Sequence, residues 1–407
     1  MNNQLIEKMT SVLLLLFPAT LMTVSDGGSV ILVLLLLVSS ISLLLGNNSI
    51  PLSKNEKHLL AIISVYILVY IFNVWFFNSK ISELDNTSRF LLLLPIFFYL
   101  RKLKINPDYI YYGILLGAIA SFTIAAYQTY YLDIFRPYGV TKAVAFGGLS
   151  ITLAIMCLFI GSLSTERRSK VLFYSGAIMA TWASILSASR GTWLAVLPCL
   201  LIWLIINPKK SSIKTRVITA LISLLIIIVS YNLPIVKYRV DQAIIEVNNY
   251  TTNSVANTSL GIRLEAWRAS IIIIKDNFAL GIGEGNFRSG IQMLSDKGIV
   301  NPTVFAPLEH AHNEYISALL HRGILGVLSL LLLLLIPLIV FSKALITEKT
   351  DRKILPAIGV TLIVTTMTFS LSDIYFAQHH YTIFYVAFIY ILYATMSPHS
   401  TNIIKET

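Results

Sequence analysis

Long apolar runs, separated by short polar segments, dominate the hydrophobic pattern of this chain. A helix that crosses a membrane needs about 20 mostly apolar residues, and about twelve stretches are candidates. They lie near residues 10–25, 29–46, 58–77, 88–100, 109–131, 143–164, 171–188, 191–207, 216–234, 314–341, 354–372 and 376–396. The fourth run is short, and a start near Ser82 would lengthen it. The pattern therefore predicts an all-α, polytopic membrane protein.

The loops between these runs alternate between rich and poor in Lys and Arg. Because basic loops stay in the cytoplasm, this alternation predicts the orientation. The rich loops hold Lys54, Lys57, Arg101, Lys102, Lys104, Arg167, Arg168, Lys170, Lys209, Lys210, Lys214, Arg216, Lys343, Lys349, Arg352 and Lys353. Both termini fall on that side and are predicted to be cytoplasmic. The first run is predicted to be a span and not a cleaved signal peptide, since no A-x-A-like site follows it.

One loop on the opposite side is much longer than the others and divides the chain. Residues 1–234 are predicted to hold spans 1–9, residues 235–312 the external loop, and residues 313–407 spans 10–12 and a cytoplasmic tail. Within the loop, residues 263–278 (RLEAWRASIIIIKDNF) have helical periodicity, and residues 250–259 are predicted to be coil. The glycines of LGIGEGNF, at residues 280–287, follow a helix and not a strand, so a turn is predicted instead of a nucleotide site.

Composition agrees with a membrane protein. Of the residues 56% are hydrophobic and 13% charged, whereas a soluble domain carries roughly a quarter charged residues. Most of the net charge of +11 lies in the basic loops, which argues against a nucleic-acid partner. Cys157 and Cys199 lie inside apolar runs, so neither a disulfide framework nor a cysteine metal cluster is predicted.

The densest polar chemistry lies where the long loop ends, in the segment EHAHNEYISALLHRGILG at residues 309–326. A helix from His312 to Phe341 would be about 45 Å long, which exceeds the ~30 Å hydrocarbon core. His312 is therefore predicted to lie at the external membrane interface, where a neutral imidazole can act as a base. A histidine with only a hydrogen-bonding role is the alternative. Gly323 and Gly326 are predicted to let a neighbouring helix approach closely.

A metal site is a second interpretation of the same segment. Histidines spaced as His310 and His312 bind zinc in extended segments, and Glu309 lies beside them. No third strong ligand is evident nearby, because His321 would lie more than two turns along the helix. No metal is predicted.

Two arginines on the external side are candidates for binding an anion. Arg190, in SASRGTWLA, lies in a tight turn where the positive-inside rule disfavours arginine, and a guanidinium suits phosphate. Anchoring to lipid headgroups is the alternative. Arg263, in SLGIRLEAW, is predicted to lie in the first turn of the loop helix, where the helix N-terminus also attracts anions. A solvated surface residue is the alternative here.

Other polar residues on the external side are candidates for supporting roles. Asp373, in SLSDIYFAQHH, is predicted to orient a histidine or an arginine, whereas His379 and His380 mark the interface. Further positive potential around the same cavity is expected from Arg89, Arg136 and Lys142.

These motifs resemble those of the bacterial O-antigen ligases, within the wider O-antigen ligase/polymerase superfamily. His312-Asn313, nine residues, then Gly323-x-x-Gly326 is similar to the ligase pattern H-[NSQ]-x9-G-x-x-G. The segments around Arg190 and Arg263 are similar to the two arginine motifs of the family. The order of the spans, long loop and histidine also fits, so the resemblance covers essentially the whole chain.

The resemblance implies a GT-C-like glycosyltransferase fold, with a helical periplasmic lid over a cavity in a membrane bundle. It implies transfer of O-antigen polysaccharide from undecaprenyl pyrophosphate to the lipid A-core at the periplasmic face of the inner membrane, without metal or cofactor. By carry-over, His312 is the catalytic base, and Arg190 and Arg263 bind the pyrophosphate. Asp373 matches an acidic position of the family, and supporting roles fall to Asn313, Gly323 and Gly326.

Three other functions remain open from the motifs. An O-antigen polymerase or a protein O-oligosaccharyltransferase shares much of the superfamily pattern. A transporter of the lipid-linked glycan would need charges at the membrane midplane. The predicted spans are nearly free of such charges apart from the segment around His321 and Arg322, which counts against transport.

Overall fold

The computed structural model describes six ranges of the chain: residues 3–45, 50–206, 234–253, 257–300, 310–349 and 352–397. Within these ranges every regular element is a helix. The elements are α1 (Asn3–Thr23), α2 (Gly27–Leu45), α3 (Lys54–Phe76), the 3-10 helix η1 (Ile81–Leu84), α4 (Asp85–Leu92), α5 (Leu94–Leu100), α6 (Asp108–Tyr130), α7 (Ala143–Leu163), α8 (Arg167–Leu186), α9 (Arg190–Trp193), α10 (Val196–Ile206), α12 (Pro234–Asn253), α13 (Ser259–Asn277), α14 (Phe287–Asp296), α16 (Glu314–Thr347), α17 (Ile354–Phe369) and α18 (His379–Thr395).

Six of the described helices are long and apolar enough to cross a membrane: α1, α2, α3, α6, α7 and α16. α17 and residues 191–202 are apolar but shorter. The described part of the chain is thus all-helical, and the chain is a polytopic membrane protein, as predicted, while the count of about twelve spans stays a prediction. The expected span at residues 216–234 lies outside the described residues except for Pro234, where α12 begins. The expected span at residues 88–100 is divided at Leu93 into α4 and α5, with Pro95 in the first turn of α5.

α7 and α18 form the interior of the bundle. Every residue of α18 from Tyr381 to Ala394 is buried, and α18 packs against α2, α4, α5, α7 and α17. An aromatic cluster joins this core to α3, since the Tyr66 ring lies 5.5 Å from that of Phe90 and 6.1 Å from that of Phe376, measured between centroids. The cluster packs α3 against α4 and the segment that precedes α18.

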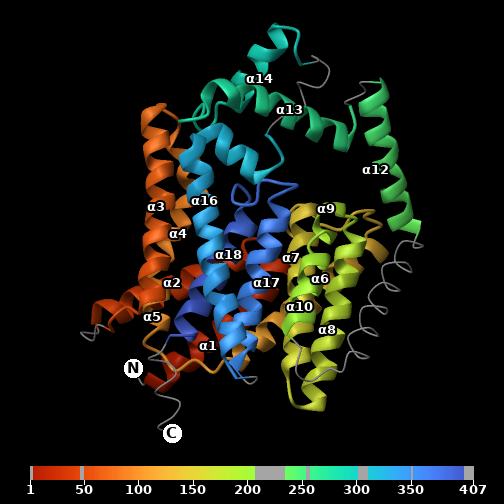
Figure 1. Ribbon diagram of the computed structural model, residues 1–407. Coiled ribbons are helices and arrows are strands. Elements are labelled where there is room, and N and C mark those ends of the chain that lie inside the picture. The colour runs from red at the N-terminus through yellow and green to blue at the C-terminus, as the bar shows by residue number, and fades with distance from the viewer. Residues whose placement is uncertain are drawn as a thin grey trace.

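A helical cap covers one end of the bundle. In Figure 1, α13 and α14 lie across that end and α12 stands beside it. A second, smaller core joins the cap to α16, because Ala266 and Ala269 of α13 pack with Leu320 of α16 and with Ala311. The predicted loop helix is therefore present as α13, and it begins four residues earlier than residue 263. The prediction of coil at residues 250–259 is wrong at its start, since α12 continues to Asn253.

At the opposite end, a buried ion pair ties α3 to the segment after α5. Ser53 caps α3 by accepting from the N–H of Glu56, and the Glu56 carboxylate accepts from the N–H of Ser53. The same carboxylate pairs with Arg101 at 2.5 Å, and both side chains are buried. Arg101, one of the basic residues used to predict orientation, is therefore neutralised within the fold.

Candidate functional site

His312 precedes α16 in a backbone conformation that non-glycine residues rarely adopt. Its φ is +49°, in the left-handed region. Asn313 is the N-cap of α16: its side-chain oxygen accepts from the N–H of Ile316 at 3.0 Å, and its amide donates to the carbonyl of Leu371 at 3.0 Å. His312 therefore lies in a loop and not at the helix start, which was predicted wrongly. Its side chain is 25% exposed, so part of the ring is accessible.

Asp373 lies beside His312, in the turn between α17 and α18. Its Oδ1 is 3.9 Å from Nδ1 of His312, a separation too long for a hydrogen bond but short enough for an interaction between charges. Burial alone would raise the pKa of Asp373. The neighbouring His312 ring, the N–H of Ile374 and the His310 ring together lower this pKa below its usual value. Asp373 is thus a buried anion that faces the imidazole.

The turn that carries Asp373 is fixed to the start of α16. The N–H of Glu314 donates to the carbonyl of Ser370 at 2.8 Å, and the Glu314 carboxylate accepts from the N–H of Phe376 at 3.1 Å. Asp373 accepts from the N–H of Ile374 and from the Gln378 amide. Two backbone segments 61 positions apart in sequence are held together in this way, so the geometry of His312 and Asp373 does not depend on their own weak contact.

His310 completes a group of three possible metal ligands. Its ring centroid is 4.0 Å from that of His312, and the ligand atoms of His310, His312 and Asp373 all lie within 4.8 Å of one another. The expectation that no third ligand is nearby is wrong, because Asp373 supplies one. Two imidazoles and a carboxylate suit zinc. However, Nδ1 of His310 already accepts from the N–H of His312 at 3.3 Å, and Asp373 has the two donors described above. The absence of a metal stays a prediction.

The backbone of Arg190 lies next to the turn that carries Asp373. Arg190 is the first residue of α9, and its side chain lies outside the described part of the chain. A Cβ on Gly191 would lie 2.6 Å from Oγ of Ser372, so α9 packs directly on the Asp373 turn. Arg136 also reaches this region, where its Nε donates to the carbonyl of Ser187 at 3.2 Å. The Arg190 motif and Asp373 are thereby brought together.

Arg263 is half-buried on α13, in the second turn of that helix. The prediction that it lies in the first turn is wrong, because α13 begins at Ser259. Thr258 accepts from the N–H of Gly261 at 3.0 Å, and Glu246 accepts from the N–H of Leu260 at 2.8 Å. These two N–H groups have protein acceptors, so an anion at Arg263 would bind to the side chain and not to the helix terminus.

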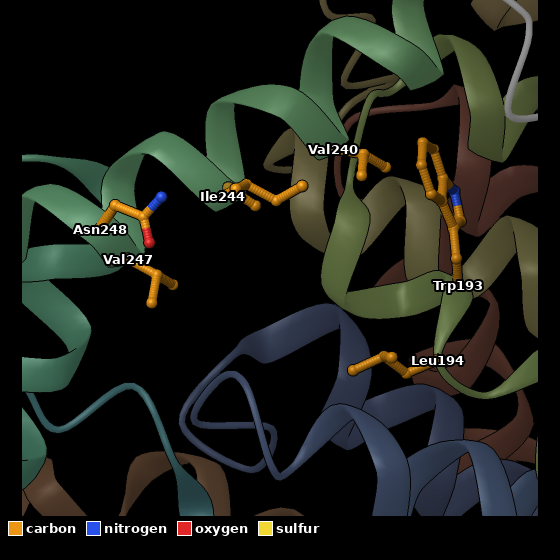
Figure 2. A pocket seen from close by; sticks show the side chains of 7 residues that line it. Trp193, Leu194, Val240, Ile244, Val247 and Asn248 are labelled. Carbon is orange, nitrogen blue, oxygen red and sulfur yellow. The ribbon is translucent and has the colours of Figure 1, made fainter.

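An apolar pocket of about 530 Å³ lies between the start of the α9–α10 segment and α12 (Figure 2). Trp193 and Leu194 line one side, and Val240, Ile244 and Val247 line the other at helical spacing. Trp193 is three residues after Arg190, and α12 packs against α13, which carries Arg263. The pocket therefore offers an apolar surface between the segment that bears Arg190 and the helix that packs against the Arg263 helix.

Gly323 interrupts α16 and accommodates a loop. Its φ is +60° and its ψ is −156°, and a Cβ there would collide with the carbonyl of Ala279. Leu320 and His321 precede the interruption, and their carbonyls bond to this loop. They accept from the N–H groups of Ile282 and Gly283, both at 2.9 Å. The predicted reason for Gly323, a close neighbouring helix, is wrong: the close neighbour is the loop between α13 and α14.

Gly326 leaves room for Arg322. A Cβ added at Gly326 would collide with the Cβ of Arg322. The Arg322 guanidinium forms an ion pair with Glu284 and lies 3.9 Å from the centroid of the Tyr70 ring. Burial alone would raise the pKa of Glu284, but Arg322 and His321 lower it below its usual value. A buried ion pair thus joins α16 to the loop between α13 and α14.

The sequence interpretation missed Glu284, Tyr70 and the role of Arg322. One signal was present: Glu314, Ser317 and His321 recur at i, i+3 and i+7, which puts three polar side chains on one face of α16. No sequence pattern indicated that Glu284 would be their neighbour.

Comparison with known proteins agrees with the motifs. A family model for O-antigen ligase matches residues 175–331, a range that includes Arg190, Arg263, His312 and Gly326. The chain is 25% identical to an uncharacterized protein of Haemophilus influenzae over 384 residues, which are 92% of this chain and 95% of the relative. It is 24% identical to an O-antigen ligase of Escherichia coli over 307 residues, 69% of this chain and 70% of the relative. The predicted resemblance is confirmed.

Proposed function

We propose that this chain, which carries an O-antigen ligase domain at residues 175–331, transfers O-antigen polysaccharide from undecaprenyl pyrophosphate to the lipid A-core. The reaction takes place at the periplasmic face of the inner membrane, and both termini are cytoplasmic. The observation that carries the proposal is the buried Asp373 carboxylate 3.9 Å from the partly exposed His312 ring within a chain of this family. An imidazole oriented by an anion is the arrangement that a general base needs.

The donor supplies the leaving group in this mechanism. The bond between the anomeric carbon and the pyrophosphate oxygen breaks, and undecaprenyl pyrophosphate leaves with the electron pair. Arg190 and Arg263 stabilise its charge, as preorganised guanidinium groups do for phosphates. The apolar pocket lined by Trp193 and Ile244 suits the first isoprenoid units of the donor.

The acceptor hydroxyl is the weak nucleophile and needs the base. Because Nδ1 of His312 faces Asp373, Nε2 is the nitrogen available to remove the proton. The acceptor oxygen then forms the new bond to the anomeric carbon as the pyrophosphate leaves from the opposite side. One direct displacement gives inversion at that carbon, and the imidazolium that forms is stabilised by Asp373.

A His312→Ala variant expressed at the normal level tests the base in cells. The expected result is lipopolysaccharide whose core carries no O-antigen, together with accumulated lipid-linked polymer. His58→Ala is a matched control, because His58 is an exposed histidine on α3 outside the proposed site, and it should leave capping intact. Full capping in His312→Ala would contradict the assignment.

The same experiment separates the ligase from a polymerase. Loss of a polymerase would leave single repeat units attached to the core, whereas loss of a ligase leaves the core bare. The relative described as an O-antigen ligase favours the second outcome.

A further inference from the structure

A polar cavity of about 370 Å³ lies beside the proposed base, on the side of α3 and α4. It is lined by the start of α16, the loop between α13 and α14, and the segment from η1 to α4. Its volume falls within the range of small-molecule sites, roughly 300–1,000 Å³. His310, whose ring contacts that of His312, forms part of its wall. The mechanism above uses none of the residues that line this cavity.

Two buried side chains on this wall have polar atoms without hydrogen-bond partners. Arg322 is 5% exposed and Ser317 is 7% exposed. Nε and Nη2 of Arg322 and Oγ of Ser317 have no partner, although Nη1 of Arg322 donates to Glu284. Buried donors without acceptors are costly and rare in folded proteins. Oxygen atoms of a bound molecule in the cavity would satisfy them.

The charge of the wall indicates which molecule fits. Four carboxylates, those of Glu83, Asp85, Glu284 and Glu314, face two guanidinium groups, those of Arg288 and Arg322. Arg322 pairs with Glu284, and Arg89 pairs with Asp85 from outside the wall, so the wall has no excess of positive charge that would attract an anionic ligand. Carboxylates accept from hydroxyl groups, and guanidinium groups donate to hydroxyl oxygens. A ligand with many hydroxyl groups and no charge is complementary to both.

We propose that this cavity binds the terminal sugar of the acceptor, that this sugar is uncharged, and that His310 and Ser317 position its hydroxyl toward His312. The inference rests on the proposed ligase function. The donor does not suit the cavity, because its pyrophosphate would meet the carboxylates. The apolar pocket assigned to the donor lies on the opposite side of the bundle: in Figure 1, α3 and α4 are at the left, and α9 and α12 are at the right.

The test is steady-state transfer by the purified full-length protein, with the donor and the acceptor varied in turn. The acceptors are lipid A-core ending in a neutral hexose and the same core ending in a hexuronic acid. The variants are Ser317→Ala and Glu83→Gln. Ser184→Ala is the matched control, because Ser184 is also a buried serine whose hydroxyl has no partner, and it lies on α8 outside this cavity. Ser317→Ala loses no hydrogen bond of the protein, so its Tm should equal that of the wild type.

The expected result is a KM for the hexose acceptor that rises roughly three- to ten-fold in Ser317→Ala, as for loss of one neutral hydrogen bond. Glu83→Gln should show a larger rise and weaker discrimination against the hexuronic acid. The KM for the donor should stay unchanged in both variants, and Ser184→Ala should match the wild type. Unchanged acceptor KM values in both variants, or a raised donor KM instead, would overturn the acceptor cavity alone. A wild-type protein that transfers to neither core would overturn the ligase proposal and the cavity with it.

Discussion

His312 and Asp373 are held together by the backbone around them more than by their own contact. The N–H of Glu314 and the side-chain amide of Asn313 both donate to carbonyls of the α17–α18 turn. These bonds fix the 3.9 Å separation of the His312 and Asp373 side chains. Asp373 has a lowered pKa and remains an anion well below neutral pH. Its proposed role is therefore to orient the His312 ring and to stabilise the ring's protonated form.

Asp373→Asn tests that role. The amide oxygen can still accept from the N–H of Ile374, so the turn should persist, but the charge is lost. We expect the transfer rate to fall roughly 10- to 100-fold, as for a misplaced reacting group. The control is Asp296→Asn, an exposed position on α14. An unchanged transfer rate would exclude the orienting role.

At the scale of the element, Gly323 gives α16 a left-handed backbone interruption that other residue types adopt only at a cost in stability. Gly323→Ala should destabilise the protein by more than the ~1–2 kcal/mol of a left-handed non-glycine residue, because the new Cβ would also meet the Ala279 carbonyl. Gly298→Ala isolates the conformational part, since Gly298 has a φ of +69° and nothing within 4 Å of a Cβ. Unfolding in detergent should show a lower Tm for Gly323→Ala than for Gly298→Ala. Equal Tm values would refute the loop contact.

The ion pair between Glu284 and Arg322 joins α16 to the cap. Glu284→Gln leaves a buried guanidinium without its counter-charge, and we expect a loss of ~3–5 kcal/mol in the free energy of unfolding. Asp85→Asn is the comparison, because Asp85 pairs with Arg89 at 2.8 Å but is 72% exposed, and such pairs contribute ~0–1 kcal/mol.

The pH dependence of the same variant has a definite sign. The pKa of Glu284 is lowered in the folded protein, so its stabilisation is fully present above the unfolded value of ~4.3. It is lost as pH falls through the lower folded value. The stability difference between the wild type and Glu284→Gln should therefore be constant near neutral pH and shrink only below about pH 4.3. A difference that is already gone at pH 6 would contradict the pairing.

Helices were easier to predict from the sequence than the faces by which they pack. The spacing of Leu264, Trp267, Ile271 and Ile274 predicted α13, which is present. Only Ile274 of these four is buried, and Ile271 is 49% exposed. The face that packs on α16 is built from Ala266, Ala269 and Ile273. Periodicity reports that a helix is amphipathic, but small residues that permit close contact carry little hydrophobic signal.

In the site, too, the sequence predicted features formed by neighbouring residues and missed contacts between distant ones. The motif around His312 was recognisable because its residues are neighbours in the chain. Glu284 and Arg322 are 38 positions apart. The loop that carries Glu284 is held against α16 at Gly281, which lies against the backbone of α16, and at Gly323, which lies against the backbone of the loop. Contacts of this kind depend on tertiary packing, so they follow from the fold and not from a local pattern.

At the scale of the whole molecule, the proposed orientation has a direct test. Cys157 and Cys199 are buried, so labelling by a thiol reagent should report mainly on a single introduced, exposed cysteine. Ser82 and Lys57 are both exposed and belong to segments assigned to opposite sides of the membrane. In spheroplasts, a membrane-impermeant thiol reagent should label Ser82→Cys and spare Lys57→Cys until the membrane is opened. The reverse pattern would invert the topology.

The central claim is a metal-independent transfer in which His312 is the base. Its most direct test is transfer by the purified protein in detergent, with defined undecaprenyl-pyrophosphate-linked O-antigen and lipid A-core, with and without a chelator. The account predicts product with wild-type protein at equal rates in both conditions. It also predicts a rate for His312→Ala that is lower by roughly 10²–10⁴-fold, the usual contribution of a general base. Activity that the chelator abolishes and zinc restores would assign His310, His312 and Asp373 to a metal site and contradict this account.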